Sequence, residues 1–282
     1  MTDIEIGHHV SRRRERRNDE QGECDVDTTR LDTGVPVTGA VAVVTGANRG
    51  LGRAYVTALL ERGAARVYAG ARNPDSVVVD DNRITAVARD ITDAAAVSAA
   101  ASAAPDATIV INNAGVMLES PFLSASDPDA ARKEMDTNYF GTLTMARVFA
   151  PVLAANGGGA LVNVLSVASF YSLPFNASYC ASKAAEWSLT NALRLEMHGA
   201  GTLVVGVHPG FIDTDMTATV RDDKIAPGEV AAQTLDAVQA GRPEVLTDDF
   251  TRGIKQTIPQ HFQTLYPDVQ RRWDAGANPW GG

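Results

Sequence analysis

Short apolar runs alternate with longer Ala-rich stretches along most of the chain. The apolar runs are rich in β-branched residues and span residues 40–44, 66–71, 84–88, 108–111, 159–165, 203–207 and 244–246. Runs of this length between Gly and polar residues predict buried strands. Apolar residues at helical spacing predict helices over residues 52–62, 94–104, 129–155, 178–197 and 227–240. Seven strands alternating with helices predict one α/β domain: a doubly wound, Rossmann-type, mostly parallel sheet with helices on both faces.

The two ends of the chain do not follow this alternation. Residues 1–36 have six arginines, nine acidic residues and no aromatic residue, a composition too polar to bury a core, which predicts a disordered N-terminal arm. The arginines cluster between Arg12 and Arg17, which leaves a tether to nucleic acid open, but no apolar segment follows them as an export signal requires. We expect the main domain over residues 37–250, and an extension of one or two short helices packed on it over residues 251–282.

Composition narrows the class of protein. The 282 residues carry a net charge of −9 and are 45% hydrophobic, which is typical of a globular domain and unfavourable for binding nucleic acid. No apolar run is long enough to predict a membrane span. Cys24 and Cys180 are too far apart for a disulfide framework or a zinc site, and His8 and His9 are too few for another metal. We therefore expect a cytoplasmic protein without a metal.

A glycine-rich turn, Thr45-Gly46-Ala47-Asn48-Arg49-Gly50-Leu51-Gly52, joins the first predicted strand to the first predicted helix. Glycines let the backbone approach a pyrophosphate, and the helix N-terminus offers it unpaired N–H groups and partial positive charge. The spacing Gly-x-x-x-Gly-x-Gly differs from the Gly-x-Gly-x-x-Gly of most dinucleotide folds. A plain strand–helix connection would also accept three glycines, but the position after the first strand favours a dinucleotide site.

The end of the second predicted strand indicates which dinucleotide binds. An acidic residue about 20 residues after the glycines would bind a ribose 2′-hydroxyl, whereas an arginine would accommodate a 2′-phosphate. Arg72 occupies this position, and no acidic residue lies between the strand and Asp75. Arg49 in the turn can reach the same phosphate with a forked pair of donors. Each arginine alone could be a surface side chain, but the two together favour NADP (NADPH/NADP+) over NAD.

Polar side chains with catalytic potential follow at later points in the chain. Tyr179 and Lys183 are four residues apart, so a helix places them on one face. Ser166 follows the strand predicted over residues 159–165, at the carboxyl edge of the sheet, where α/β proteins bind ligands. Asn112-Asn113-Ala114-Gly115 ends another strand at this edge, and Asn138 lies in the long helical stretch that follows.

These pieces resemble the short-chain dehydrogenase/reductase family, in its common single-domain branch, over about residues 38–250. The matching pieces, in the family's order, are the turn at residues 45–52, Asp90, Asn112–Gly115, Asn138, Ser166, Tyr179-x-x-x-Lys183 and Pro209-Gly210. Two features depart from the family pattern. Leu165 stands where the family often has a small polar residue, and the tails before residue 38 and after residue 250 match no family motif.

The resemblance implies a catalytic tetrad of Asn138, Ser166, Tyr179 and Lys183. It also implies that Lys183 holds the nicotinamide ribose and that Asn138 holds a water connecting Lys183 to solvent. Thr214, after Pro209-Gly210, is expected to contact the nicotinamide amide. The residues expected to bind the cofactor are Gly46, Asn48, Arg49, Gly50, Leu51, Arg72, Asp90, Ile91, Asn113, Ala114, Gly115, Tyr179, Lys183, Pro209, Gly210, Ile212 and Thr214.

The chemistry of these side chains agrees with the implied roles. A phenol has a pKa near 10, and a neighbouring ammonium lowers that pKa. We therefore expect Tyr179 to exchange a proton with a substrate oxygen as hydride moves, while Ser166 donates a hydrogen bond to that oxygen. The predicted function is an NADP-dependent carbonyl reductase or alcohol dehydrogenase. The alternative is a non-catalytic NADP-binding redox sensor on the same fold, against which the presence of both Tyr179 and Lys183 argues. His208 is interpreted as structural.

Apolar residues also bear on the substrate and on the assembly. Apolar residues around two segments after the strands predict a pocket for a hydrophobic ketone or secondary alcohol, although packing alone would also place aromatic residues there. They are Phe170, Tyr171, Leu173, Phe175 and Met216. Apolar residues on the helices at 129–155 and 178–197 predict a homodimer or homotetramer, unless they serve only to cover the sheet.

Overall fold

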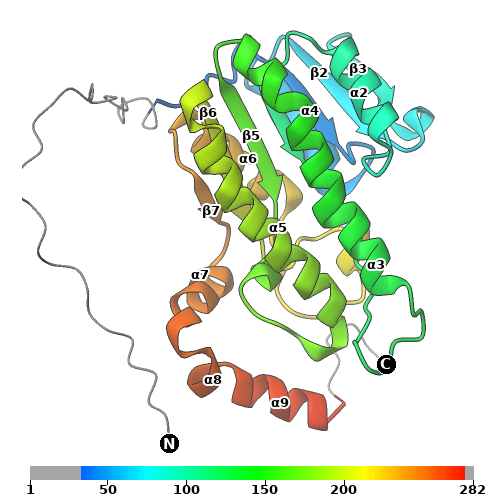
Figure 1. The fold of residues 1–282 in the computed structure, drawn as a ribbon, viewed down its shortest axis with the longest axis vertical. Helices are drawn as coiled ribbons and strands as arrows, with labels where there is room; N and C mark the ends of the chain where they lie inside the picture. The colour runs from blue at the N-terminus through cyan, green and yellow to red at the C-terminus, as the bar shows by residue number, and fades with distance from the viewer. Residues whose placement is uncertain (1–32, 277–282) are drawn as a thin grey trace, which may run out of the picture.

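The computed structural model describes residues 33–276 and contains one parallel sheet of seven strands (Figure 1). The strand order is β3-β2-β1-β4-β5-β6-β7. The strands are β1 (Val41–Thr45), β2 (Arg66–Ala71), β3 (Ile84–Ala88), β4 (Ile109–Asn112), β5 (Gly159–Val164), β6 (Thr202–His208) and β7 (Glu244–Leu246). Each boundary lies within one residue of the position predicted from the sequence. The predicted fold class is confirmed.

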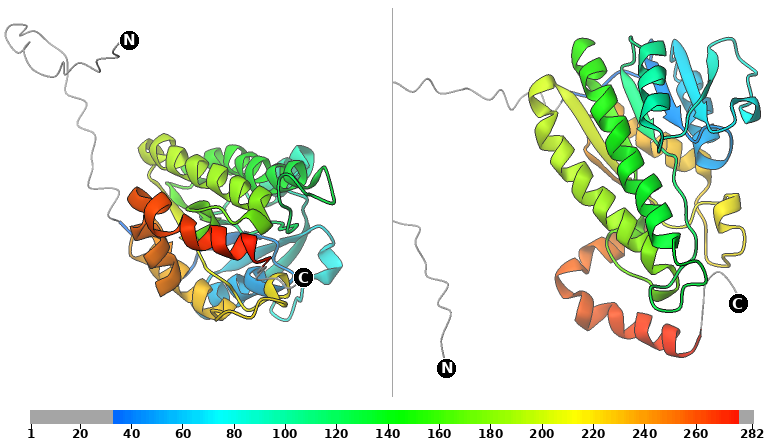
Figure 2. Two further views of the ribbon diagram at one scale, coloured as in Figure 1. Left: turned by 90° about the horizontal axis from the view of Figure 1, so that it is seen from below. Right: turned by 45° about the vertical axis from the view of Figure 1, so that its right-hand side comes forward.

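Helices cover both faces of the sheet (Figure 2). One face is covered by α1 (Gly50–Glu61) and α6 (Pro227–Gln239). The other is covered by α2 (Ala94–Ala103), α4 (Thr142–Ala155) and α5 (Ala177–Glu196). Each face therefore has its own apolar core, in which burial of one large side chain contributes about 1.5–3 kcal/mol. Fully buried members include Tyr55, Leu59 and Leu235 on the first face, and Met145, Phe149 and Leu161 on the second.

The winding of the sheet changes direction between β1 and β4. β1 pairs in parallel with β2 on one side and with β4 on the other, so the helices that follow these two strands cover opposite faces. The two connections diverge at this point and leave a crevice outside the carboxyl ends of the strands. Open parallel sheets bind their ligands in such a crevice.

The long helix predicted over residues 129–155 is interrupted. It consists of α3 (Ala130–Glu134), a π-helical segment η3 (Met135–Gly141) and α4, which begins at Thr142. Single-turn π-helical segments insert an extra residue into the hydrogen-bond ladder and are frequent at functional sites. Asn138 lies at the centre of this segment, which turns its side chain toward α5.

The predicted N-terminal arm extends too far into the domain. Val35 N–H donates to Val238 O at 2.9 Å, and a Cβ on Gly34 would lie 1.7 Å from Gln239 O, so residues 34 and 35 pack against α6. Val37 is fully buried beside them. The prediction is wrong for these last residues of the arm, because valines at 35 and 37 have enough apolar surface to join the core. Residues 1–32 of the predicted arm lie outside the described residues.

The C-terminal extension crosses the end of the domain at which the strands terminate (Figure 1, Figure 2). It contains α7 (Asp249–Gln256), α8 (His261–Thr264) and α9 (Tyr266–Asp274). α7 begins before the predicted boundary at residue 251, because the Asp248 carboxylate caps it by accepting from Thr251 N–H at 2.7 Å. Ser172 N–H donates to the Tyr266 hydroxyl at 3.3 Å and ties α9 to the main domain. Within residues 33–276, no helix has the length and apolarity needed to cross a membrane.

Candidate active site

The glycine turn after β1 forms a tight cradle at the start of α1. Gly46 and Gly50 have φ angles of +64° and +51°, a left-handed conformation that residues with side chains rarely adopt. A Cβ on Gly52 would lie 2.0 Å from Gly46 O, so the absence of a side chain lets the turn and the helix touch. Asn113 holds the turn against β4, since its Nδ2 donates to Thr45 O at 2.9 Å. The cradle is therefore shaped by backbone contacts.

The N-terminus of α1 is open to an anion. Its N-cap residue, Arg49, makes no side-chain cap hydrogen bond, and the first turn contains no acidic residue. The first N–H groups of the helix therefore lack an intrahelical partner, and the helix dipole adds partial positive charge. Phosphate groups bind at such termini. The cradle and the helix end together fit the pyrophosphate of a dinucleotide.

A cavity of about 610 Å³ extends from this cradle along the carboxyl ends of the strands. All residues expected to bind the cofactor line it, from the glycine turn through Arg72, Asp90 and Asn113 to the segment after β6. Ser166, Tyr179 and Lys183 line the same cavity. The structure therefore brings these residues together at one cavity, and their roles stay predictions.

The outer end of the cavity carries the two arginines expected to bind a 2′-phosphate. Arg72 is exposed there. Arg49 has a partner that the sequence did not reveal: its Nη1 lies 3.0 Å from Asp215 Oδ2, with the two side chains 69% and 77% exposed. An exposed ion pair of this kind contributes little to stability, so a phosphate can compete with Asp215 for Arg49. Asp90 accepts from the hydroxyl and the N–H of Thr92, and these bonds lower the pKa of Asp90.

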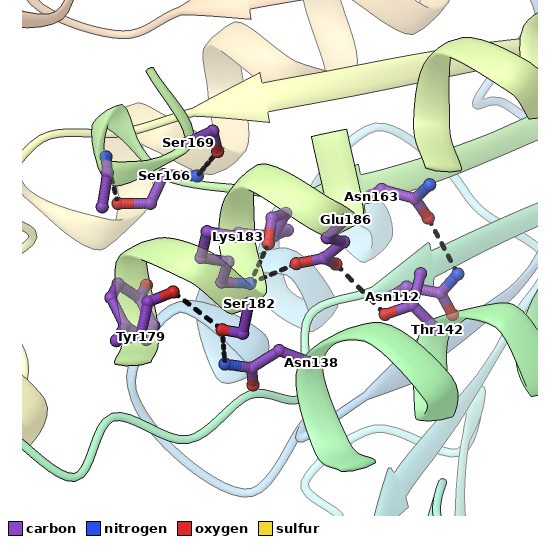
Figure 3. A network of polar contacts seen from close by, with 12 residues as sticks. Asn112, Asn138, Thr142, Asn163, Ser166, Ser169, Tyr179, Ser182, Lys183 and Glu186 are labelled. Carbon is purple, nitrogen blue, oxygen red and sulfur yellow. Dashed lines mark hydrogen bonds and ion pairs between the residues drawn. The ribbon is translucent and has the colours of Figure 1, made fainter. Parts of the chain in front are cut away.

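Asn138 is fully buried, and Figure 3 shows its side chain beside that of Ser182. Its Nδ2 donates to Val116 O and to Ser182 Oγ, both at 2.9 Å, and its Oδ1 accepts from Val116 N–H at 2.9 Å. The side chain is thus engaged by protein partners.

Lys183 is anchored by two buried partners (Figure 3). Its Nζ donates to Val164 O at 2.8 Å and to Glu186 Oε2 at 2.6 Å. The other carboxylate oxygen, Glu186 Oε1, accepts from the Thr142 hydroxyl at 3.1 Å. Burial acts to lower the pKa of Lys183, but attraction to Glu186 and Tyr179 outweighs it and raises that pKa, so the side chain is an ammonium.

Tyr179 lies one helical turn before Lys183, whose Nζ is 5.9 Å from the centre of the phenol ring. Burial raises the pKa of Tyr179 above its ordinary value, while the charge of Lys183 and a hydrogen bond with Ser166 lower it only in part. Glu186 adds to the rise. Lys183 thus lowers the pKa of the phenol as expected, and burial together with Glu186 acts in the opposite direction.

Ser166 is held in place by local hydrogen bonds at the end of β5. Its hydroxyl accepts from Ala168 N–H at 3.1 Å, and its own N–H donates to Ser169 Oγ at 3.3 Å. These bonds begin the short helix η4 (Val167–Ser169) with a capping box, which fixes the serine beside Tyr179. The hydroxyl hydrogen of Ser166 can then point into the cavity.

Two neighbouring side chains belong to the core. His208 stacks on Phe170 at a ring distance of 4.3 Å, and burial lowers the pKa of His208 to about 3, which agrees with a structural role. Phe170 was expected to line the substrate pocket, and this is wrong because the ring packs between His208 and Trp187. Tyr171, Leu173 and Met216 do line the cavity.

Sequence reasoning missed Glu186, Thr142 and Ser182. The signal for Glu186 was its position three residues after Lys183, but on a helix surface such a pair is usually an exposed ion pair of small effect. Here the side chains of Lys183 and Glu186 are 5% and 2% exposed. Arg89 was also missed: it is 3% exposed, lines the cavity and lies 5.4 Å from the centre of the Phe149 ring.

A doubly wound sheet, a glycine cradle and a Ser–Tyr–Lys group at the carboxyl edge define the class of dinucleotide-dependent oxidoreductases. The chain belongs to the short-chain dehydrogenase family, whose model, described as short chain dehydrogenase, matches residues 40–225. The resemblance drawn from the motifs is thereby confirmed.

Individual relatives of known sequence and structure support the same family. The chain is 31% identical to dehydrogenase/reductase SDR family member 7B of Xenopus tropicalis, over 85% of this chain and 86% of that protein. A short-chain dehydrogenase of Burkholderia cenocepacia, solved in complex with NADP, is 44% identical and superposes with a TM-score of 0.80, covering 83% of this chain and 98% of that one. A 3-ketoacyl-(acyl-carrier-protein) reductase of Brucella melitensis, solved with NADH, is 26% identical with a TM-score of 0.69, covering 74% and 96%.

Proposed function

We propose that the protein is an NADP(H)-dependent reductase of carbonyl compounds that also oxidises the corresponding secondary alcohols. The observation that carries this proposal is that Ser166, Tyr179 and Lys183 share one cavity with the glycine cradle. The cradle fits a pyrophosphate, and the three side chains supply a proton donor, a hydrogen-bond donor and a fixed positive charge. Together these are the groups that hydride transfer to a carbonyl requires from a protein.

Each side chain has a defined task in this reaction. A bound nicotinamide supplies hydride to the carbonyl carbon or accepts it in the reverse direction. The Tyr179 hydroxyl gives its proton to the carbonyl oxygen as negative charge develops there. Ser166 donates a hydrogen bond to the same oxygen. Lys183 uses two of its three N–H groups on Val164 O and Glu186, which leaves the third to hold the ribose hydroxyls of a bound cofactor.

The preference for NADP rests on Arg72 and Arg49 at the outer end of the cavity. Guanidinium groups bind phosphate oxygens with charge-assisted hydrogen bonds, and the end of β2 has no carboxylate that would bind a 2′-hydroxyl instead. The Burkholderia cenocepacia relative was solved with NADP, which supports this choice. The Brucella melitensis relative, which is less similar, was solved with NADH.

A hydrophobic ketone is the proposed substrate. Tyr171, Leu173 and Met216 line the cavity beside the catalytic side chains, and they offer apolar surface to a substrate that extends beyond its carbonyl group. A cytoplasmic homodimer or homotetramer is the proposed form of the protein. Phe140 and Leu195, which lie next to α4 and on α5, are 51% and 81% exposed and would be covered in such an assembly.

The test is turnover by the purified full chain. NADPH and NADH are each supplied with ketones of graded size, and loss of reduced cofactor is followed by absorbance. We expect oxidation of NADPH with apolar ketones and slower reaction with NADH. Binding of NADPH without turnover of any ketone, aldehyde or alcohol would instead favour the redox-sensor alternative.

A further inference from the structure

Glu186 is a buried carboxylate in direct contact with the catalytic lysine. It lies on α5, three residues after Lys183, and its side chain is 2% exposed. One oxygen accepts from Lys183 Nζ at 2.6 Å and the other from the Thr142 hydroxyl at 3.1 Å (Figure 3). A buried carboxylate is costly unless both its charge and its hydrogen bonds are satisfied. Both are satisfied here: burial raises the pKa of Glu186, and the contacts with Lys183 and Thr142 act against that rise and favour the charged form.

The carboxylate restricts where Lys183 can point. An ammonium has three N–H donors, and Val164 O and Glu186 Oε2 take two of them. The remaining N–H is left for groups bound in the cavity. Thr142 begins α4, so the hydrogen bond from its hydroxyl couples the position of Lys183 to the helix that follows the π-helical segment. Glu186 thus orients the lysine through contacts on two helices.

Glu186 also opposes the electrostatic effect of Lys183 on Tyr179. The lysine favours the phenolate form of Tyr179, whereas the carboxylate disfavours it. A buried unit charge within roughly 10 Å shifts a pKa by about one unit. The two opposite charges lie on the same helix as the tyrosine, within two turns of it. The phenol therefore stays protonated to higher pH than it would beside the lysine alone.

Other titratable groups near this cluster do not change the sign of the effect. They are Cys180 on α5, Glu134 on α3 and His208 on β6. Burial raises the pKa of Cys180 to about 11 and lowers that of His208 to about 3, so both are uncharged near neutral pH. Glu134 accepts from Leu118 N–H at 2.6 Å and acts on Cys180. Among the described residues, Lys183, Glu186 and, once it is ionised, Cys180 act on Tyr179 through their charge.

We propose that Glu186 is a positioning residue whose charge keeps Tyr179 protonated, so that the active site is poised for carbonyl reduction near neutral pH. This inference rests on the proposed function, since it concerns the proton that Tyr179 gives to the carbonyl oxygen. In reduction, that proton and a hydride complete the alcohol, and solvent returns a proton to the phenolate. A higher pKa of the Tyr179–Lys183 pair widens the pH range in which the Tyr179 hydroxyl carries the proton that it donates.

The experiment compares Glu186→Gln with Glu186→Asp in the full-length protein. Gln keeps the shape and removes the charge, while Asp keeps the charge and shortens the side chain. The pH dependence of kcat/KM is measured for alcohol oxidation and for carbonyl reduction. We expect the midpoint of both profiles to fall by about one pH unit or more in Glu186→Gln and to stay near the wild-type value in Glu186→Asp. A purely structural role predicts the reverse order, with Asp the more harmful change.

A second measurement does not depend on turnover. Tyrosine labelled with ¹³C at the ring carbon that bears oxygen reports ionisation by NMR, and Tyr179→Phe assigns the Tyr179 signal. We expect the midpoint of this signal to fall in Glu186→Gln and to stay unchanged in Glu134→Gln, a matched loss of a buried carboxylate that does not contact Lys183. An unchanged midpoint in folded Glu186→Gln overturns the inference. Absence of turnover in the wild type overturns the proposed function, and the NMR result still decides the role of Glu186.

Discussion

The cavity has two ends, one at the glycine turn and one at Ser166 and Tyr179, and they differ in the burial of their charged groups. At the dinucleotide end, the glycine turn shapes the site through backbone contacts, and the charged side chains Arg49 and Arg72 are exposed. At the proposed catalytic end, which carries Ser166 and Tyr179, the side chains of Asn138 and Lys183 are 0% and 4% exposed and hydrogen-bond to other protein groups. Ionic contacts at the first end are screened by water, whereas those at the second act in a low dielectric.

This difference in burial predicts which single substitutions cause the largest loss of affinity, activity or stability. An exposed arginine that is lost leaves no unsatisfied partner, so its removal reduces affinity by the value of its own contacts. Removal of a buried residue of the proposed catalytic network leaves its partner without a hydrogen bond or a counter-charge. The resulting loss of free energy is several times larger than for an exposed arginine. The predicted effects of substitution therefore decrease from the proposed catalytic end to the exposed edge of the dinucleotide end, the rim, at Arg49 and Asp215.

The largest effect is expected from Tyr179→Phe. The substitution removes the transferable proton and leaves the glycine cradle and Lys183 in place, so turnover should fall by roughly 10²–10⁴-fold while NADPH binding changes little. Steady-state kinetics and NADPH titration by fluorescence measure the two quantities. Turnover within tenfold of wild type would mean that another group protonates the substrate.

Lys183→Met should lower stability as well as activity. It leaves the carboxylate of Glu186 buried without its counter-charge, a loss of about 3–5 kcal/mol in the free energy of unfolding. Lys183→Met/Glu186→Gln should recover much of that stability without recovering turnover. Burial raises the pKa of Glu186, and loss of Lys183 raises it further. The destabilisation should therefore shrink at acid pH, where Glu186 becomes protonated, and grow as the pH rises through that pKa.

Denaturant unfolding of Lys183→Met and of the double variant over a range of pH measures these free energies of unfolding. Equal stability of the single variant at acid and neutral pH would show that Glu186 is not ionised there.

The contrast between the two ends also explains what the sequence could predict. The strands were predictable because parallel strands buried on both faces are continuous apolar runs, as at Val41–Thr45. The glycine cradle was predictable because the need for a left-handed backbone at Gly46 and Gly50 limits the residue type. Local patterns of this kind are visible in one stretch of chain.

The catalytic network was only partly predictable, since it depends on contacts between distant segments. Glu186 contacts Thr142 from another helix, and Asn138 contacts Ser182, 44 residues away. Neither pairing has a signature in local spacing. The pKa of Tyr179 could not be predicted for the same reason, because it depends on burial and on Glu186 as well as on the lysine one turn away.

A smaller effect is expected from Arg72→Ala at the dinucleotide end. Loss of a charge-assisted contact with the 2′-phosphate should raise KM for NADPH about tenfold to a hundredfold and leave KM for NADH nearly unchanged. Adding Ala71→Asp should then favour NADH, because a carboxylate accepts from the 2′-hydroxyl and repels the phosphate. If the wild-type enzyme used NADH as efficiently as NADPH, the assignment of this end to NADP would be wrong.

The smallest effect is expected at the exposed pair of Arg49 and Asp215. The carboxylate of Asp215 lies 3.0 Å from the guanidinium that the 2′-phosphate is proposed to use, so Asp215→Asn should free Arg49 and lower KM for NADPH by less than about fivefold. Asp213→Asn is the matched control, because Asp213 is 75% exposed on the same segment and faces Lys224 instead. Added salt should remove the difference between Asp215→Asn and wild type, since exposed charges are screened. A rise in KM would mean that Asp215 holds Arg49 in the orientation that binds phosphate, and the rim would then resemble the catalytic end, where each charge is positioned by its partner.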